Sequence, residues 1–286
     1  NQDDINEADF PIYAAYYRAI NNRILVNTSF TYLRFVKALC ESNFSLTNLV
    51  NIQSVPERHC QLFAVMCHYD FWDKTAKQAG FSSISSSIAT LNISPLKEEL
   101  LEVITLLIER LETQEFSMPS VENEIVDNSP LKMHVRYPKE HILIAFGDTT
   151  IDRKSSSREG VLNITSTNTE LLFVTLNKCE KQFSVTTMYH DYAISPTLFH
   201  WQTQNSSKPT SGKGLSYIEH KQNKKTLILF VREQAKDAYG KTMGFVNFGP
   251  VELVKYEGSQ PMNITWRLKH PMPTYMWHNS AKLAVG

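Results

Sequence analysis

The sequence predicts an α+β protein in two parts: an N-terminal helical bundle over residues 1–126, then a C-terminal curved β-sheet or small barrel over residues 127–286. Glycine marks the division, because the first part holds one glycine and the second holds nine. Glycine is costly inside helices, whereas the turns between strands use it. Beyond Gly147 the apolar residues also change from helical spacing to short runs of strand length.

Helical spacing of apolar residues recurs over residues 10–24 and 30–39. Two further helices, over about 58–70 and 95–115, follow prolines suited to a first helical turn. The last of these has leucines on one side and glutamates on the other, as a helix packed on one face does. We therefore expect a bundle of five or six helices with its tyrosines and phenylalanines in the core.

The second part begins after a polar connector at residues 118–128, with a short helix over 137–146 that Gly147 ends. Seven aliphatic or β-branched runs then predict short strands. The runs are 160–164, 171–176, 199–204, 226–231, 245–248, 251–256 and 262–268. Seven strands with few helices favour a curved sheet or a small barrel.

The formal net charge of zero conceals two halves of opposite sign. Residues 1–126 contain 9 basic and 16 acidic residues, a net charge of −7, and residues 127–286 contain 20 and 13, a net charge of +7. Such an asymmetry is typical of a basic module that faces nucleic acid, but two halves that attract each other produce it too.

Motifs for bond-making chemistry are missing from the sequence. It has no phosphate-binding G-x4-G-K-[ST] loop, no G-x-S-x-G nucleophile elbow and no H-x-x-x-H pair. Cys60 and Cys67, beside His59 and His68, do not have C-x2-C spacing, and we interpret them as structural thiols rather than metal ligands. We expect no catalytic residue, no cofactor and no metal.

The sequence also argues against a membrane protein. No apolar run approaches the roughly 18 residues that a membrane span needs. Residues 1–9 are acidic and polar, unlike a signal peptide. Reduced cysteines fit a cytoplasmic location. Because the first residue is Asn, we expect the chain to be a fragment of a longer protein or a processed chain.

Residues 189–205 are the strongest clue to function. Strand alternation places Phe199, Trp201 and Thr203 on one face and His200, Gln202 and Gln204 on the other, with Phe199 in the core. Flat rings beside amide groups suit the recognition of a nucleobase. In the preceding loop, Asp191 could accept from the cytosine amino group or cap a turn, and both interpretations stay open. The candidate base-binding residues are Tyr189, Asp191, Tyr192, His200, Trp201, Gln202 and Gln204.

Polar and basic residues follow this stretch and could contact the DNA backbone, although a solvated surface is the default for each of them. The candidates are Asn205, Lys208, Lys213, Lys221, Lys224, Lys225 and Arg232.

Several phrases of the second part resemble the C-terminal domain of bacterial ATP-dependent helicase-nucleases. They are LLFVTLNK at 171–178, TMY at 187–189 through FHWQ at 199–202, YIEHK at 217–221, LFVRE at 229–233 and EGSQPM at 257–262. The resemblance spans about residues 130–273. It points to SauUSI-like type IV restriction enzymes, which cut DNA containing 5-methylcytosine or 5-hydroxymethylcytosine. In these proteins the domain follows a phospholipase-D-type nuclease and a superfamily 2 helicase.

The resemblance implies an SRA-like, PUA-related fold that flips a modified base out of duplex DNA, in the service of bacterial defence. The base-binding residues above are placed by their chemistry and are not carried over from the family. Residues 1–126 would couple this module to the helicase and nuclease domains of the parent protein, so we expect no enzyme activity from this chain alone. The alternatives are a structural domain that docks onto the helicase without reading a base, or recognition of another mark or of DNA shape.

Overall fold

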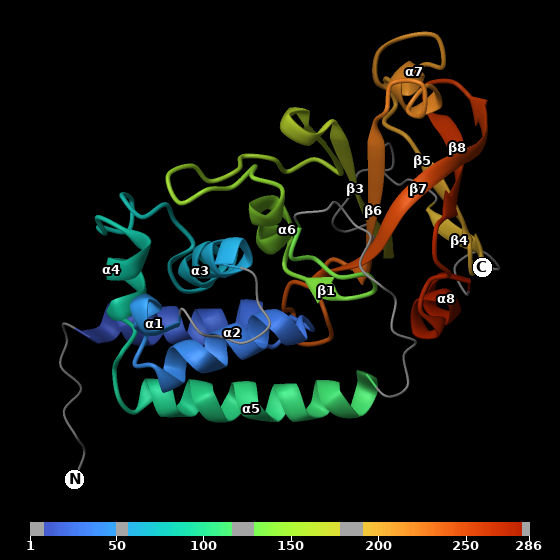
Figure 1. Ribbon diagram of the computed structural model, residues 1–286. Coiled ribbons are helices and arrows are strands. Elements are labelled where there is room, and N and C mark those ends of the chain that lie inside the picture. The colour runs from blue at the N-terminus through green and yellow to red at the C-terminus, as the bar shows by residue number, and fades with distance from the viewer. Residues whose placement is uncertain (1–8, 50–56, 116–128, 178–190, 282–286) are drawn as a thin grey trace. The chain divides into compact units, whose positions relative to one another are not determined.

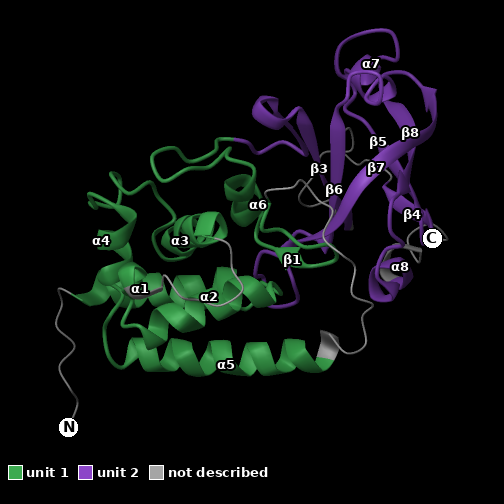
Figure 2. Ribbon diagram, in the orientation of Figure 1, with its two compact units in different colours: residues 1–156 green, residues 157–286 purple. Residues whose placement is uncertain are grey.

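A computed structural model describes residues 9–49, 57–115, 129–177 and 191–281. The chain forms two compact units, residues 1–156 and 157–286 (Figure 2). Residues 129–156, which we expected in the second part, lie in unit 1, because Ile144 of their helix packs into the core of the helical unit. Unit 1 is acidic, and unit 2 holds 15 basic and 9 acidic residues, a net charge of +6.

Unit 1 is helical, and the four helices expected over residues 10–24, 30–39, 58–70 and 95–115 are confirmed (Figure 1). Its elements are α1 (Phe10–Ala19), the π-helical turn η2 (Ile20–Ile24), α2 (Phe30–Glu41), the 3-10 turn η3 (Leu46–Leu49), α3 (Glu57–Trp72), α4 (Ile84–Ala89), α5 (Leu96–Glu115), β1 (Arg136–Tyr137) and α6 (Lys139–Ala145). The sequence did not predict α4, which begins in a serine-rich segment where the Ser83 and Ser86 side chains form a capping box.

A fully buried polar network links three helices of unit 1. The Asp70 carboxylate accepts from the Tyr32 hydroxyl at 2.6 Å and lies 2.7 Å from Nε2 of His141. The Asn27 Oδ1 accepts from the Ser29 backbone N–H, which turns the Asn27 Nδ2 toward Nδ1 of His141 at 3.2 Å. Nδ1 is therefore placed as an acceptor, and Nε2 as the donor to Asp70. With no access to solvent, the network stabilises the helical packing.

Unit 2 is built on a mixed sheet with two helices. Its elements are β2 (Val161–Ile164), the 3-10 turn η4 (Thr165–Thr167), β3 (Thr169–Asn177), β4 (Tyr192–Ser195), β5 (Leu198–Gln202), α7 (Gly212–Ile218), β6 (Thr226–Gln234), β7 (Phe245–Gly258), β8 (Met262–Leu268) and α8 (Thr274–Ala281). The strand order is β2-β3-β6-β7-β8-β5-β4. The β3–β6 pair is parallel and the other pairs along this path are antiparallel.

Each of the seven predicted runs overlaps a strand, but β4 was not predicted and two further differences appear. The runs at 245–248 and 251–256 form one strand, β7, which passes through Gly249 and is bent by register shifts instead of being broken by a turn. The described strand path is open, with β2 and β4 at its edges, so it forms a sheet rather than a closed barrel.

The middle of β6 is buried on both sides of the sheet, whereas the main hydrophobic cluster of unit 2 lies on one side. Trp266, Phe199 and Ile264 are fully buried there, together with Met276 of α8. The α7 helix lies at one end of the sheet and α8 lies beside β4 (Figure 1). Because α8 covers the apolar side, the opposite side of β4, β5 and β8 is left to polar residues.

Candidate functional site

Residues 191–202 form a β-hairpin, with Tyr192 in β4 instead of in the loop that we expected. The alternation predicted for β5 is confirmed, since Phe199 is 0% exposed and Trp201 5%, whereas His200 and Gln202 are half-buried on the other side. Tyr189 lies outside the described residues. The stretch therefore presents one packed face and one polar face.

The polar face continues across four strands, and we call it the outer face. Cross-strand pairing places Tyr192 opposite His200, His200 opposite Thr265, and Thr265 opposite Lys255. A second row joins Gln202, Asn263 and Glu257, and a third includes Arg267. The outer face consists of Tyr192, His200, Gln202, Lys255, Glu257, Asn263, Thr265 and Arg267.

An aromatic pair lies at the β4 side of the outer face. The rings of Tyr192 and His200 stack with centroids 4.6 Å apart and an interplanar angle of 10°. Both rings are half-buried. The pair therefore presents a flat, preorganised π surface of the kind on which a base stacks.

An amide pair lies beside the rings. The Gln202 Nε2 donates to the Asn263 Oδ1 at 3.2 Å. Among the described residues, the Gln202 Oε1 and the Asn263 Nδ2 make no further hydrogen bond, which leaves one acceptor and one donor next to the stacked rings. Such a combination matches the polar edge of a base.

Charged residues border the outer face on β7 and β8. Lys255 and Glu257 form an exposed ion pair at 2.8 Å, and the hydrogen bond from Lys255 lowers the pKa of Glu257. Arg267 is exposed and stands opposite Glu252, whose carboxylate pairs with Lys221 at 2.8 Å. Exposed pairs of this kind are worth little, so these cations stay available for another anion.

Three of the expected base-binding residues serve the packing of unit 2. Trp201 packs its ring against Tyr217 and Trp266, with centroids 5.3 and 6.1 Å away. The buried Asp191 accepts from the Gln202 backbone N–H at 2.9 Å, which fixes β4 to β5. Gln204 follows the end of β5, and its Oε1 accepts from the Tyr217 hydroxyl at 3.4 Å. Its side chain therefore does not continue the row formed by His200 and Gln202.

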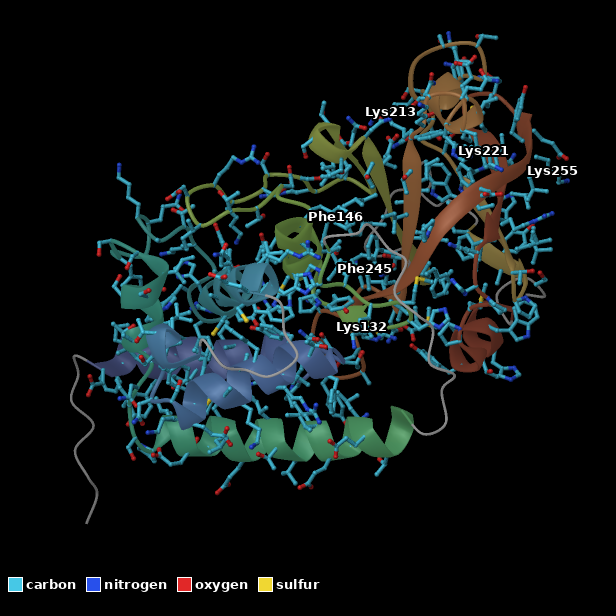
Figure 3. The ribbon with its side chains drawn as sticks, viewed as in Figure 1. Lys132, Phe146, Lys213, Lys221, Phe245 and Lys255 are labelled. Atoms are coloured by element: carbon cyan, nitrogen blue, oxygen red, sulfur yellow. The ribbon has the colours of Figure 1, made fainter. Side chains whose placement is uncertain are left out.

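The expected backbone-binding residues divide into two groups. Lys208, Lys213, Lys221 and Lys224 are exposed around α7, as is Asn205, and Lys213 pairs with Glu159 at 3.6 Å. Figure 3 shows Lys213, Lys221 and Lys255 toward the end of unit 2 where α7 lies. Lys225 and Arg232 face inward instead. Lys225 binds the buried Glu170 at 2.8 Å, and burial lowers the pKa of Arg232 to about 10.

Five residues of the outer face were absent from the sequence-based set: Lys255, Glu257, Asn263, Thr265 and Arg267. The sequence does carry a signal for the three on β8, because polar residues alternate there with Met262, Ile264 and other buried apolar residues. It does not reveal that β8 pairs with β5, and this pairing alone brings Asn263 to Gln202.

The described parts of the chain show neither a cluster of metal ligands nor a membrane-spanning helix. No three His, Cys, Asp or Glu side chains within the described ranges are grouped as metal ligands. In the same ranges, none of the helices has the length and apolar character to cross a bilayer.

These features define an α+β module whose open sheet carries a polar face. The chain belongs to the family described as Domain of unknown function (DUF3427), whose model matches residues 131–280. No curated protein matches the chain. Among solved structures it is similar to "The 5-Hydroxymethylcytosine-Specific Restriction Enzyme AbaSI", with 13% identity and a TM-score of 0.33 over 63% of this chain and 55% of that one. The chain thus spans little more than half of that enzyme, and a TM-score this low does not establish a common fold.

Proposed function

We propose that unit 2 is a DNA-binding specificity module that recognises a modified cytosine, 5-methylcytosine or 5-hydroxymethylcytosine, in duplex DNA by base flipping. The observation that carries the proposal is the stacked Tyr192–His200 pair beside the Gln202–Asn263 amide pair on the outer face. The rings would stack on the flipped base and the amides would bind its polar edge. The sequence resemblance to type IV restriction enzymes supports the same function.

Backbone contacts would supply most of the affinity. Flipping a base costs a few kcal/mol, and burying a 5-methyl group returns only about 1 kcal/mol. Unit 2 has a net charge of +6, and the exposed lysines around α7 can exchange weak carboxylate partners for phosphates. We therefore expect strong dependence on salt and a moderate preference for the modified base.

The proposal extends to the rest of the parent protein. Unit 1 would couple the reader to a helicase and a phospholipase-D-type nuclease, as the C-terminal part of an ATP-dependent type IV restriction endonuclease. Catalysis would then belong to those other domains. In this scheme unit 2 selects the site, and the parent protein acts on it.

A binding titration tests the module. Fluorescence anisotropy with the full 286-residue chain compares duplexes that differ only by 5-methylcytosine, 5-hydroxymethylcytosine or cytosine, at several salt concentrations. We expect tighter binding of a modified duplex. Equal affinity for all three would overturn base recognition, and no binding at all would favour the docking role.

Two substitutions on the outer face locate the site. His200→Ala removes half of the aromatic stack, and Gln202→Ala removes one amide. Each should reduce the preference for the modified duplex more than the affinity for the unmodified one. Tyr275→Ala and Gln234→Ala delete exposed residues of similar type away from the outer face and serve as controls. An unchanged preference in both outer-face variants would mean that the base binds elsewhere.

A further inference from the structure

The turn between β6 and β7, residues 235–244, presents one aromatic side chain to solvent. Tyr239 is 87% exposed, the highest value among the large apolar side chains of the described residues. Exposing a tyrosine this fully gains nothing for folding, because its ring buries no area. The side chain is therefore available to a ligand.

Hydrogen bonds hold the backbone around Tyr239 in one conformation. The Asp237 Oδ1 accepts from the backbone N–H groups of Tyr239 at 2.9 Å and Lys241 at 2.8 Å. The Asp237 N–H donates to the Lys241 carbonyl at 2.8 Å, and Gly240 takes the left-handed conformation with φ +76°. A backbone fixed in this way lowers the entropy lost when the ring binds a partner.

The base of the turn is fixed to the sheet. The Arg232 Nη1 donates to the Met243 carbonyl at 3.3 Å and its Nε donates to the Thr175 hydroxyl at 2.9 Å. The same guanidinium lies 4.4 Å from the centre of the Phe245 ring. Arg232, which the sequence offered as a phosphate contact, instead anchors the turn that carries Tyr239.

The surroundings of Tyr239 favour a nucleic acid over a protein partner. Apart from the half-buried Met243, residues 235–244 contain no other large apolar side chain, whereas a protein hot spot is enclosed by a ring of further contacts. Lys236 and Lys241 flank the tyrosine in sequence. An isolated ring between two cations matches a base bordered by phosphates.

We propose that the β6–β7 turn is a second DNA contact, in which Tyr239 stacks on an unstacked base while Lys236 and Lys241 bind the adjoining phosphates. The proposal rests on the DNA-binding function proposed for unit 2. The turn lies at the Phe245 end of β7, away from Lys255 (Figure 3). At about 3.3 Å per residue, the 14 residues of β7 span at most roughly 45 Å, or about 13 base pairs, because its register shifts bend the strand. A duplex of about 24 base pairs is therefore long enough to reach both contacts.

Binding of a duplex of about 24 base pairs to the full chain tests the contact. Tyr239→Ala should weaken binding by about 5- to 150-fold, the equivalent of the ~1–3 kcal/mol that one base–aromatic stack contributes. Tyr239→Trp, which keeps a flat ring, should retain the affinity. Tyr275→Ala, which deletes another exposed tyrosine of unit 2, is the matched control and should bind as the unaltered chain does.

An abasic site gives a second readout. A ring that fills a gap in the base stack should make the unaltered chain prefer a duplex with an abasic site, and Tyr239→Ala should lose that preference. If the unaltered chain prefers the modified duplex while Tyr239→Ala keeps full affinity for every duplex, the turn is not a DNA contact and the proposed function stands. If the unaltered chain binds no duplex, both proposals fail.

Discussion

Its buried ion pair with Glu170 distinguishes Lys225 from the exposed lysines that we propose as DNA contacts. The Lys225 side chain is 14% exposed and that of Glu170 is 3%, with 2.8 Å between Nζ and Oε2. Lys225→Met would leave the Glu170 carboxylate buried without its cation, and breaking a buried pair in this way costs about 3–5 kcal/mol. With an m-value near 2 kcal/mol/M, the urea midpoint of unit 2 should fall by about 1.5–2.5 M.

The assay is urea unfolding followed by tryptophan fluorescence, because unit 2 holds three of the four tryptophans. Lys221→Met is the matched control: its pair with Glu252 is 61% and 58% exposed, and such pairs contribute about 0–1 kcal/mol. Combining Lys225→Met with Glu170→Leu should restore most of the loss, since no charge remains buried. A midpoint shift for Lys225→Met as small as that for Lys221→Met would refute the reasoning.

Three further predictions concern packing and pH. Gly214→Ala should destabilise unit 2 by about 2 kcal/mol or more in urea unfolding, since its Cβ would clash with the Lys208 carbonyl oxygen. Gly240→Ala places its Cβ in open space, so it should cost only the ~1–2 kcal/mol needed to hold an alanine in the left-handed conformation. Tyr32→Phe should cost about 2 kcal/mol in thermal unfolding of unit 1, because the buried Asp70 loses a hydroxyl donor; a loss below about 0.5 kcal/mol would contradict this. Burial lowers the pKa of His220 below its ordinary 6.5, so the unfolded chain takes up the proton first as the pH falls. The stability of unit 2 should therefore decrease as the pH drops below 6.5. His220→Asn should reduce this dependence of stability on pH, and an unchanged dependence would contradict the assignment.

The sequence predicts the positions of helices and strands better than it predicts which strands pair. Local spacing was enough for α1, α2, α3 and α5 of unit 1 and for the alternation of Phe199, His200 and Trp201 in β5. It missed β4, because Tyr192–Ser195 is a four-residue edge strand with only one neighbour to stabilise it. The two runs of β7 were separated because Gly249 and Pro250 indicate a turn, whereas the strand absorbs them at a register shift.

Side-chain roles were harder to predict than strands. Trp201 and Gln204 have the chemistry of base-binding residues, yet both contact Tyr217, a residue of α7 that the sequence did not predict as helical. Lys225 resembles its exposed neighbour Lys224, and only the pairing of β3 with β6 brings Glu170 within its reach. Such long-range partners depend on strand order, which local periodicity does not contain.

The parallel pairing of β3 with β6 has a kinetic consequence. Thr169 pairs with Thr226, so this part of the sheet forms only after the intervening residues, with β4, β5 and α7, have closed into a loop. Non-local pairings of this kind slow folding, whereas the backbone hydrogen bonds within each α-helix of unit 1 join residues only four apart in sequence. During synthesis unit 1 emerges first and should be folded before the last strand, β8, leaves the ribosome. Pulsed hydrogen exchange should therefore detect protection in α3 and α5 before β3 and β6.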